Sequence, residues 1–447
     1  METLTGWREP SDSTACGGLR WVMLNRRIID DEDSRSSSAS AHDANTTVVA
    51  RTSSGRVLSV SLCLAPPPRS SSFYAVWLGG DGPAGSNSKE EEDNDDDTRL
   101  LVLAAHDDCV LIEVSEMCGR FGDAHDYFLY EAGAARPPSL SLLPGRYFPM
   151  QCEQHERAGK EAHPRSLSFP YRTTGVLRLG DGDVLVAQLE FYYDKAELCV
   201  FRFRPGSGSG WVLSRVPVVH REEEGGEEYA KLQGRWRPEF EATVPVGNRF
   251  MCWVDSSDGF YLCDMAAAEE NRKLRYVPAP VATASHRGNG RPESHRSLAA
   301  AGTDAVRFVS VAPRCCCGGG VGESSCERSR FAFNVTTWTM NNLRTTTEAD
   351  EPMKWFKDGV LDCDEIWQLP SYGRLPRVAP RCPVVSADDP DIVCFMVCEA
   401  YKCIAGADET VWMVETNTSS KTIISVVRTD IFRHTADACL PIKLHIG

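Results

Sequence analysis

The chain has 447 residues, 42% of them apolar, and a formal net charge of −15. Its length suits two or three ordinary domains or one large repeat-built domain, and its apolar fraction is sufficient for a substantial core. The acidic excess disfavours binding to nucleic-acid phosphates. No apolar stretch reaches the roughly 18 to 20 residues of a membrane-spanning helix, so we expect a soluble protein with neither nucleic acid nor membrane as partner.

The 18 cysteines indicate the compartment. The first residues show no basic segment followed by an apolar core and a cleavage site, so export is not expected. Most cysteines fall in strand-like runs, where a reduced thiol behaves as a small buried apolar group. We therefore predict an intracellular protein, cytoplasmic or nuclear, and read the glycosylation sequons at Asn45, Asn334 and Asn417 as coincidental.

Short apolar and aromatic runs, bounded by Gly, Pro, Ser and Asp, predict β-strands from the beginning of the chain. In its first half these strands are 19–29, 46–50, 56–64, 73–78, 99–105 and 109–114, followed by an aromatic strand, a proline-containing turn and a Leu-rich end within 125–144. Four further strands, separated by tight turns, amount to the content of one propeller blade. They are 175–179, 183–193, 197–203 and 210–219.

The clearest hairpin joins strands 249–255 and 260–264 across the turn Ser256-Ser257-Asp258-Gly259. The strand pattern continues to the end of the sequence, through 273–280, 304–312, 330–340, 353–361, 383–386, 391–400, 411–415 and 422–428. No convincing amphipathic helix accompanies these strands, which favours an all-β fold. Because a single hairpin is not stable alone, we expect small antiparallel sheets stacked in a β-propeller-like array of about five to seven blades.

We expect residues 1–447 to form one propeller-like domain. Polar, acidic or Gly/Ser-rich stretches within it read as loop or disordered insertions, because they cannot bury enough apolar surface to order themselves. These insertions are 30–45, 79–98, 146–170, 221–230, 285–297 and 313–329.

Three segments resemble one known family. HDYFLYEAGAARPPSLSLLP at 125–144, NRFMCWVDSSDGFYLCDM at 248–265 and PVVSADDPDIVCFMVCEA at 383–400 are similar, in that order, to recurring blocks of the plant family called domain of unknown function 1618, which is expanded in grasses. The resemblance implies no catalytic residues and no ligand. It does imply a fold similar to the kelch-like propellers that accompany F-box motifs in ubiquitin-ligase adaptors, and no F-box-like helical segment precedes the strands here.

Cysteine clusters are the first candidate sites. Cys315, Cys316 and Cys317 with Cys326 could bind zinc, but adjacent cysteines point their thiolates apart and the two separated pairs of a zinc site are missing, so a variable loop is the better interpretation. Cys394, Cys398 and Cys403 are more widely spaced. Because residues an even number apart share one face of a strand, we expect Cys394 and Cys398 to pack in a sheet.

Acidic and histidine groups are the next candidates. His125-Asp126 and His106-Asp107-Asp108 offer acid–base chemistry, but neighbours on a strand face opposite ways, so we interpret both as turn or surface groups. The segment Asp388-Asp389-Pro390-Asp391 could bind a divalent cation, although a proline turn before a buried strand explains it better.

Eight tryptophans could line a binding surface, but their spread of about one per strand group is more typical of packing between sheets. They are Trp21, Trp77, Trp211, Trp253, Trp338, Trp355, Trp367 and Trp412. Phosphate-binding loops, zinc-protease motifs and nucleophile elbows are absent, since the GSGSG run at 206–210 has its serines in the wrong positions. We therefore assign no catalytic, cofactor-binding or metal-binding residue and expect no cofactor.

Three functions fit these observations. The first is a non-enzymatic scaffold that binds an unknown protein partner through loops on a rigid sheet framework. The second is a hydrolase-like enzyme with a polar site at the propeller axis, which would require carboxylates or histidines from different blades to converge. The third, a special case of the first, is a recognition module for ubiquitin ligases without its own F-box. The sequence gives no indication of oligomeric state.

Overall fold

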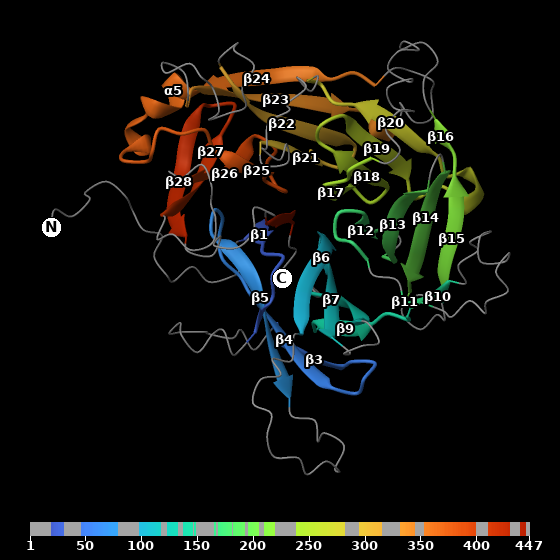
Figure 1. The fold of residues 1–447 in the computed structure, drawn as a ribbon. Helices are drawn as coiled ribbons and strands as arrows, with labels where there is room; N and C mark the ends of the chain where they lie inside the picture. Colours follow the sequence, from blue (N-terminus) through green and yellow to red (C-terminus); the bar gives the residue numbers. More distant parts are fainter. Residues whose placement is uncertain are drawn as a thin grey trace.

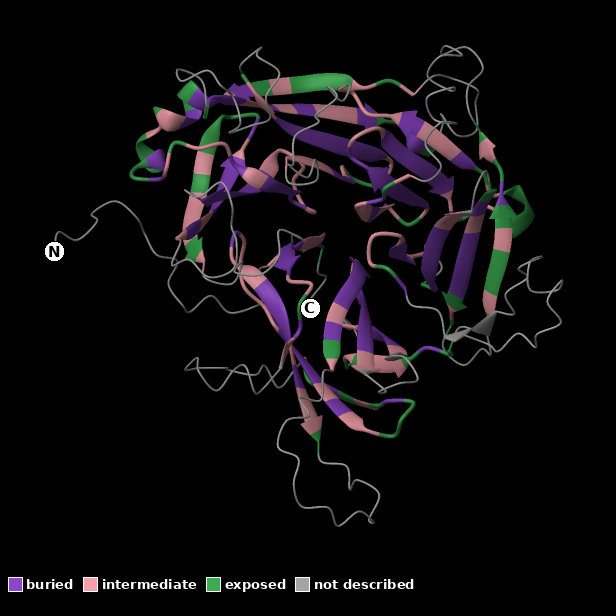
Figure 2. Cartoon of the chain, viewed as in Figure 1, coloured by how far each residue is buried: buried purple, intermediate pink, exposed green. Residues whose placement is uncertain are grey.

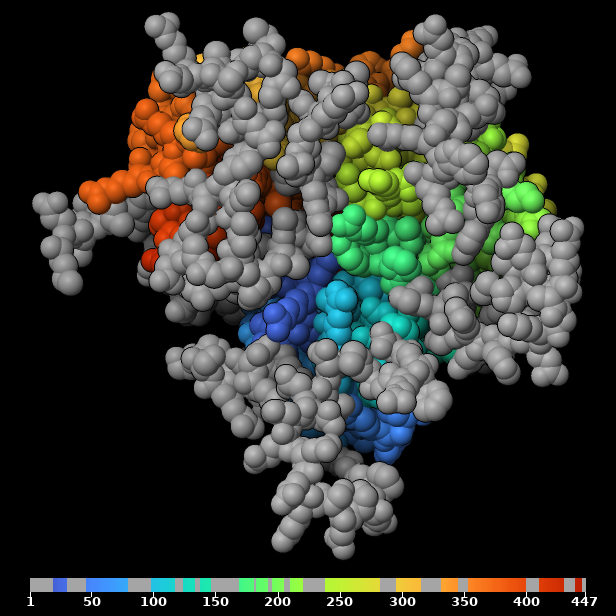
Figure 3. Space-filling model, in the orientation of Figure 1, coloured from blue at the N-terminus to red at the C-terminus, as the bar shows by residue number. Residues whose placement is uncertain are grey.

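A computed structural model shows that six small sheets follow one another around a central axis (Figure 1). It describes residues 19–30, 46–78, 98–117, 123–132, 137–145, 147–148, 165–166, 169–180, 182–192, 195–204, 210–219, 238–281, 295–314, 331–344, 353–398, 410–429 and 439–443. In the space-filling view the colours run around the ring in chain order (Figure 3). The fold is thus an all-β propeller of six blades, within the predicted range. None of the helices in these residues is long and apolar enough to cross a bilayer.

Five blades are built from consecutive strands. Blade 2 contains β6 (Arg99–His106), β7 (Cys109–Met117), β8 (Asp123–Glu131) and β9 (Ser139–Leu142), and blade 3 contains β12 (Thr174–Arg178), β13 (Val184–Tyr192), β14 (Lys195–Phe203) and β15 (Trp211–Val216). Blade 4 contains β17 (Ala242–Val246), β18 (Phe250–Asp255), β19 (Gly259–Asp264) and β20 (Leu274–Pro278), with β16 (Val218–Val219) at its outer edge. Blade 5 contains β21 (Arg296–Ala300), β22 (Ala305–Pro313), β23 (Phe333–Asn341) and β24 (Phe356–Asp362), and blade 6 contains β25 (Arg381–Val385), β26 (Ile392–Cys398), β27 (Val411–Asn417) and β28 (Thr422–Thr429).

Blade 1 joins the two ends of the described chain. Its strands are β1 (Val22–Leu24), β2 (Ile29–Asp30), β3 (Val48–Arg51), β4 (Val57–Cys63), β5 (Ser70–Leu78) and β29 (Leu440–Ile442). Strand β1 pairs with β29 in antiparallel fashion and with β5 in parallel fashion. The first and last described strands therefore close the ring within one sheet.

The inner strands form the wall around the axis. Each inner strand contacts the next one around the ring, in the order β6, β12, β17, β21, β25 and β29, and β29 contacts β6 again. Three of these strands contain a proline, namely Pro245, Pro383 and Pro441. Proline cannot donate to a sheet ladder and is accepted mainly in edge strands, so these residues fit strands that face the axis with one edge.

The cores lie between neighbouring blades. One apolar cluster joins blades 3 and 4 through residues such as Leu198 and Trp253, and another joins blades 1 and 2 through residues such as Phe73 and Phe128. Figure 2 shows that burial is highest in the inner and middle strands and falls in outer strands such as β15 and β24. The apolar faces of the strands are thus buried by stacking sheet on sheet.

Smaller elements complete the described chain. They are β10 (Tyr147–Phe148) and β11 (Arg165–Ser166), which pair with each other, the helix α5 (Cys363–Trp367), and the 3₁₀ turns Glu269–Asn271 and Pro370–Tyr372. Most of the predicted insertions fall outside the described residues, which do not include 31–45, 79–97, 149–164, 221–230, 285–294 and 315–329.

The predicted hairpin is confirmed as β18 and β19, with its turn at Ser256 to Asp258. In contrast, the single strand predicted over 19–29 is interrupted. Between β1 and β2 the chain turns to blade 2, where the Arg26 carbonyl accepts a hydrogen bond from the Val102 amide at 2.7 Å. A tertiary contact therefore divides a run that looks continuous in the sequence.

Candidate functional site

The inner strands enclose a cavity of about 480 Å³ along the axis, which we call the axial cavity. Strands β6, β17, β21, β25 and β29 line it, together with Tyr171 just before β12. Much of the wall is apolar, with Ala105, Val244, Leu298, Val384 and Leu440 among its residues. A concave, largely apolar space with a few polar groups is the usual form of a small-molecule site.

Two groups of polar residues lie at opposite ends of the axial cavity, and the inner strands, which run in the same direction, identify these ends. Where these strands end, the Arg178 amide donates to His106 Nδ1 at 3.0 Å. Where they begin, Thr243 Oγ1 donates to the Arg172 carbonyl at 3.1 Å. His106 and Asp107 therefore belong to one end, whereas Glu241, Ser256 and Arg296 belong to the other.

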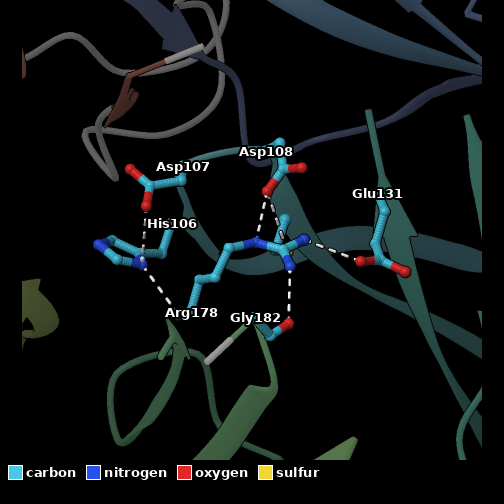
Figure 4. Close-up of polar contacts among 7 residues, drawn as sticks. His106, Asp107, Asp108, Glu131, Arg178 and Gly182 are labelled. Atoms are coloured by element: carbon cyan, nitrogen blue, oxygen red, sulfur yellow. Dashed lines mark hydrogen bonds and ion pairs between the residues drawn. The ribbon is translucent and has the colours of Figure 1, made fainter. Parts of the chain in front are cut away.

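Arg178 connects blades 2 and 3 at the end where the inner strands finish (Figure 4). Its Nε donates to Asp108 Oδ1 at 2.6 Å and its Nη2 to Glu131 Oε1 at 2.8 Å. Nη2 also lies 2.7 Å from Cys109 Sγ, and Nη1 donates to the Gly182 carbonyl at 2.9 Å. We call these groups the Arg178 network, and its function in the structure is to fasten two blades together.

Burial and neighbouring charges shift the pKa values of this network. Burial alone would lower the pKa of Arg178, but Cys109, Glu131 and Asp108 raise it above its ordinary value. Burial, assisted by Asp108, raises the pKa of the Cys109 thiol. The guanidinium therefore stays charged and the thiol stays protonated, which makes Cys109 a poor nucleophile.

Burial lowers the pKa of His106, against the opposing effect of Asp107, whose Oδ2 lies 3.8 Å from Nδ1. The unfolded chain then takes up the proton first as the pH falls below about 6.5. We expect stability to be fully present above that pH and to decrease below it, by at most about 1.4 kcal/mol per pH unit from this group. His106→Gln should remove this pH dependence. The free energy of unfolding, measured by urea denaturation, should then differ less between pH 7.5 and pH 5.5 in the variant than in the wild type. If the free energy of unfolding of the variant depended on pH as strongly as that of the wild type, His106 would not be the group responsible.

The predicted turn at His106-Asp107-Asp108 is confirmed between β6 and β7, but its side chains are engaged between blades rather than simply solvated. The other acid–base candidates diverge, as predicted. His125 Nδ1 lies 3.1 Å from Glu113 Oε1, whereas the Asp126 carboxylate accepts a hydrogen bond from the Ser53 amide at 2.7 Å.

The acidic segment Asp388 to Asp391 forms a turn between β25 and β26. Ser386 Oγ accepts hydrogen bonds from the amides of Asp388 and Asp389, both at 3.1 Å, and Asp391 Oδ1 lies 2.8 Å from Arg307 Nη2. These contacts agree with the predicted turn. The Arg307 guanidinium is the positive partner of the Asp391 carboxylate in this turn.

Cys394 and Cys398 lie on the same buried face of β26 and pack in one cluster, as predicted. Burial raises the pKa of Cys394 and raises that of Cys263 to about 12. Cys315, Cys316, Cys317, Cys326 and Cys403 lie outside the described residues. The prediction for the zinc-like cluster therefore remains a prediction.

The tryptophans pack between sheets, as predicted, because all eight belong to or contact the apolar clusters. Trp253 is fully buried, and its Nε1 donates to the Thr173 carbonyl of the preceding blade at 2.8 Å. These residues therefore contribute to the packing between the sheets.

One group in the described residues has the ligand types of a metal site. Polar atoms of Asp362, Cys363 and Asp364 lie within 4.8 Å of one another. However, Arg314 Nη1 lies 2.7 Å from a carboxylate oxygen of each aspartate. Asp362 also caps α5 by accepting from the Asp364 amide at 2.9 Å. The helix cap and the ion pairs with Arg314 therefore explain why these three side chains lie close together.

No sequence motif predicted Arg178, Glu241 or Arg296 as site residues. Arg178 falls within the predicted strand 175–179, Arg296 falls in a predicted polar loop, and Glu241 belongs to no recognised motif. In the sequence, Arg296 is 40 residues from its partner Ser256, and Arg178 is 70 residues from its partner Asp108. Only a known strand order could have brought them together.

Comparison with known proteins supports the resemblance noted in the sequence. Residues 253–394 match the family model described as "Protein of unknown function (DUF1618)". The match covers most of the block at 248–265 and much of that at 383–400, whereas the block at 125–144 lies outside it. No curated protein matches the chain.

Three solved structures show what the fold is similar to. The WD40 domain of SCAP from fission yeast is 10% identical over 86% of this chain and 74% of that chain, with a TM-score of 0.30. Sqt1 of Saccharomyces cerevisiae is 10% identical over 75% and 76%, with a TM-score of 0.29. A putative glycoside hydrolase from Bacteroides ovatus is 12% identical over 74% and 85%, with a TM-score of 0.27. At TM-scores below 0.5 these similarities assign no function.

Proposed function

Because residues 253–394 match a family without an assigned function, we propose a function from the geometry of this chain: a non-enzymatic scaffold that binds another protein. The binding surface would be a groove between blades 3 and 4. This groove has a volume of about 530 Å³ and lies beside the exposed outer strand β15. It is the single observation on which the proposal depends.

The groove has a mixed lining, in which apolar residues lie beside the polar Arg202, Asn248, Glu269 and Arg272. Leu179, Leu185, Val200, Val212 and Met265 contribute to it, with Ala266 to Ala268 along one side. Val212 is 43% exposed and its neighbour Leu213 is 42% exposed. Leu213 faces the other side of β15, so Val212 is the exposed apolar residue that borders the groove. A concave groove with an apolar residue at its edge suits an apolar side chain of a protein partner.

The walls of the groove are held by ion pairs, which favours recognition without rearrangement. In blade 3, Asp183 Oδ2 lies 2.6 Å from both Arg202 Nε and Arg204 Nη2. In blade 4, Arg249 Nη2 lies 2.7 Å from Asp264 Oδ2. A surface fixed before binding loses little conformational entropy when a partner docks.

A hydrolase at the axis is the weaker alternative. Among the described residues, the acidic and histidine side chains that line the axial cavity are His106, Asp107 and Glu241. They are divided between its two ends, so they do not converge on one substrate atom. A recognition module for ubiquitin ligases is compatible with the proposed scaffold and would use the same groove.

The test is to replace Val212 with aspartate, which places a charge in the groove. We expect binding of the partner to weaken about tenfold or more, since a charge buried in an apolar contact is costly. Partners are first captured with the wild-type chain from extracts of the source organism and identified by mass spectrometry. Each is then purified and titrated by calorimetry.

Ile424→Asp is the matched control, because Ile424 is 51% exposed on β28, in another blade. The proposal requires that Ile424→Asp binds as the wild type does while Val212→Asp does not. Equal affinities for all three chains would place the partner elsewhere.

A further inference from the structure

The end of the axial cavity where the inner strands begin contains a small polar cluster. Arg296 Nη1 donates to the Ser256 carbonyl at 2.8 Å. The Ser256 amide donates to Glu241 Oε2 at 3.3 Å. All three residues line the axial cavity, and they come from three different points in blades 4 and 5. We call them the Arg296 cluster.

Ser256 and Arg296 have side-chain hydrogen-bond donors that no described residue accepts. Ser256 is only 2% exposed, and its Oγ has no hydrogen-bond partner among the described residues. Among the described residues, the Arg296 side chain donates through Nη1 to the Ser256 carbonyl, and its Nε and Nη2 have no acceptor there. Buried polar groups normally find partners, and an arginine normally uses several of its five donors. The pattern indicates that an acceptor from a ligand belongs here.

Arg296 is the cation of this cluster, and the carboxylates of Glu241 and Asp258 are its acidic neighbours. The charged residues described along the axial cavity are the cations Arg26, Arg296 and Lys443 and the anions Asp107 and Glu241. Burial lowers the pKa of Arg296 although Glu241 and Asp258 act in the opposite direction. The guanidinium is therefore incompletely compensated by the protein, and an added negative charge would stabilise it.

We propose that the axial cavity binds a small organic carboxylate, held by Arg296 and Ser256 Oγ. A planar carboxylate can accept two parallel hydrogen bonds from one guanidinium. Its apolar body would contact the wall formed by residues such as Ala242, Val244 and Leu298. A phosphate dianion fits less well, because Glu241 lies beside Ser256 and would repel a second negative charge more strongly. This site is separate from the groove between blades 3 and 4, so either proposal can fail without the other.

The experiment is saturation-transfer NMR on the full chain with benzoate and butyrate as probes and with benzamide and butyramide as uncharged counterparts. We expect both carboxylates to bind at millimolar concentration and the amides to bind at least about tenfold more weakly. Arg296→Gln should weaken carboxylate binding about tenfold, and Ser256→Ala about threefold. Ser257→Ala should change nothing, because Ser257 is the next residue of the turn but is not among the lining residues.

Three results would overturn the proposal. They are the absence of transfer to both carboxylates at about 10 mM, equal binding of acids and amides, or unchanged binding in Ser256→Ala. Circular dichroism checks that each variant folds. If Arg296→Gln does not fold, Ser256→Ala still decides, since removing one hydroxyl leaves the backbone hydrogen bonds of the turn intact.

Discussion

Replacing Trp253 with alanine should lower the free energy of unfolding by about 3 to 5 kcal/mol. Trp253 is completely buried between blades 3 and 4, where it packs with residues such as Leu198 and Met251. The substitution would leave a cavity and also remove the 2.8 Å hydrogen bond to Thr173. Urea denaturation followed by tryptophan fluorescence and by circular dichroism would measure the loss.

Trp412→Ala provides the comparison for this prediction. Trp412 is only partly buried against the cluster between blades 5 and 6, so less contact area is lost. Its replacement should cost clearly less, about 1 to 2 kcal/mol. Equal losses for the two variants would mean that Trp253 is not the main packing residue between its blades.

Replacing Arg178 with alanine should destabilise the protein by about 2 to 4 kcal/mol. The change would leave the carboxylates of Asp108 and Glu131, which are 22% and 24% exposed, without their shared cation. A partly buried charge that loses its partner costs more than the pair contributed when it was intact. The midpoint of chemical denaturation should fall at neutral pH.

Two variants test whether the loss of stability comes from the Arg178 network itself or from the removal of any surface charge. Arg178→Lys keeps the charge but cannot span Asp108, Glu131 and Gly182 together, so it should lie between wild type and alanine. Arg215→Ala removes an arginine whose side chain is 67% exposed and 3.6 Å from Glu197, and it should cost less than about 0.5 kcal/mol. If Arg178→Ala is as mild as Arg215→Ala, the network does not fasten the blades.

The fold class could be predicted because the outer and middle strands are rich in β-branched and aromatic residues. Strands β13, β14, β18 and β19 have this composition, and tight turns separate them. The inner strands β17, β21 and β29 were not predicted. Their sequences ATVPV, RSLAA and LPI are short and contain Ala and Pro, because each strand occupies the crowded axis with one edge unpaired. The number of blades stayed uncertain for the same reason.

The polar clusters could be predicted only in part. The turns at His106 to Asp108 and at Ser256 to Asp258 were recognised from their composition, since Asp and Ser favour such positions. What they contact was not, because Arg178 and Arg296 arrive from a neighbouring blade. Contacts of this kind depend on the angle and order of the blades, which local sequence does not encode.

The pairing of β1 with β29 has a consequence for synthesis on the ribosome. Blades 2 to 6 can stack as they emerge, but β29 must be translated before it can contact β6, β25 and β1. Even the hydrogen bond from Cys439 Sγ to Asn25 Oδ1 at 3.3 Å joins residues 414 positions apart. Until then the edge of β1 next to the axis stays unpaired in the nascent protein, a state in which chaperone protection is most needed.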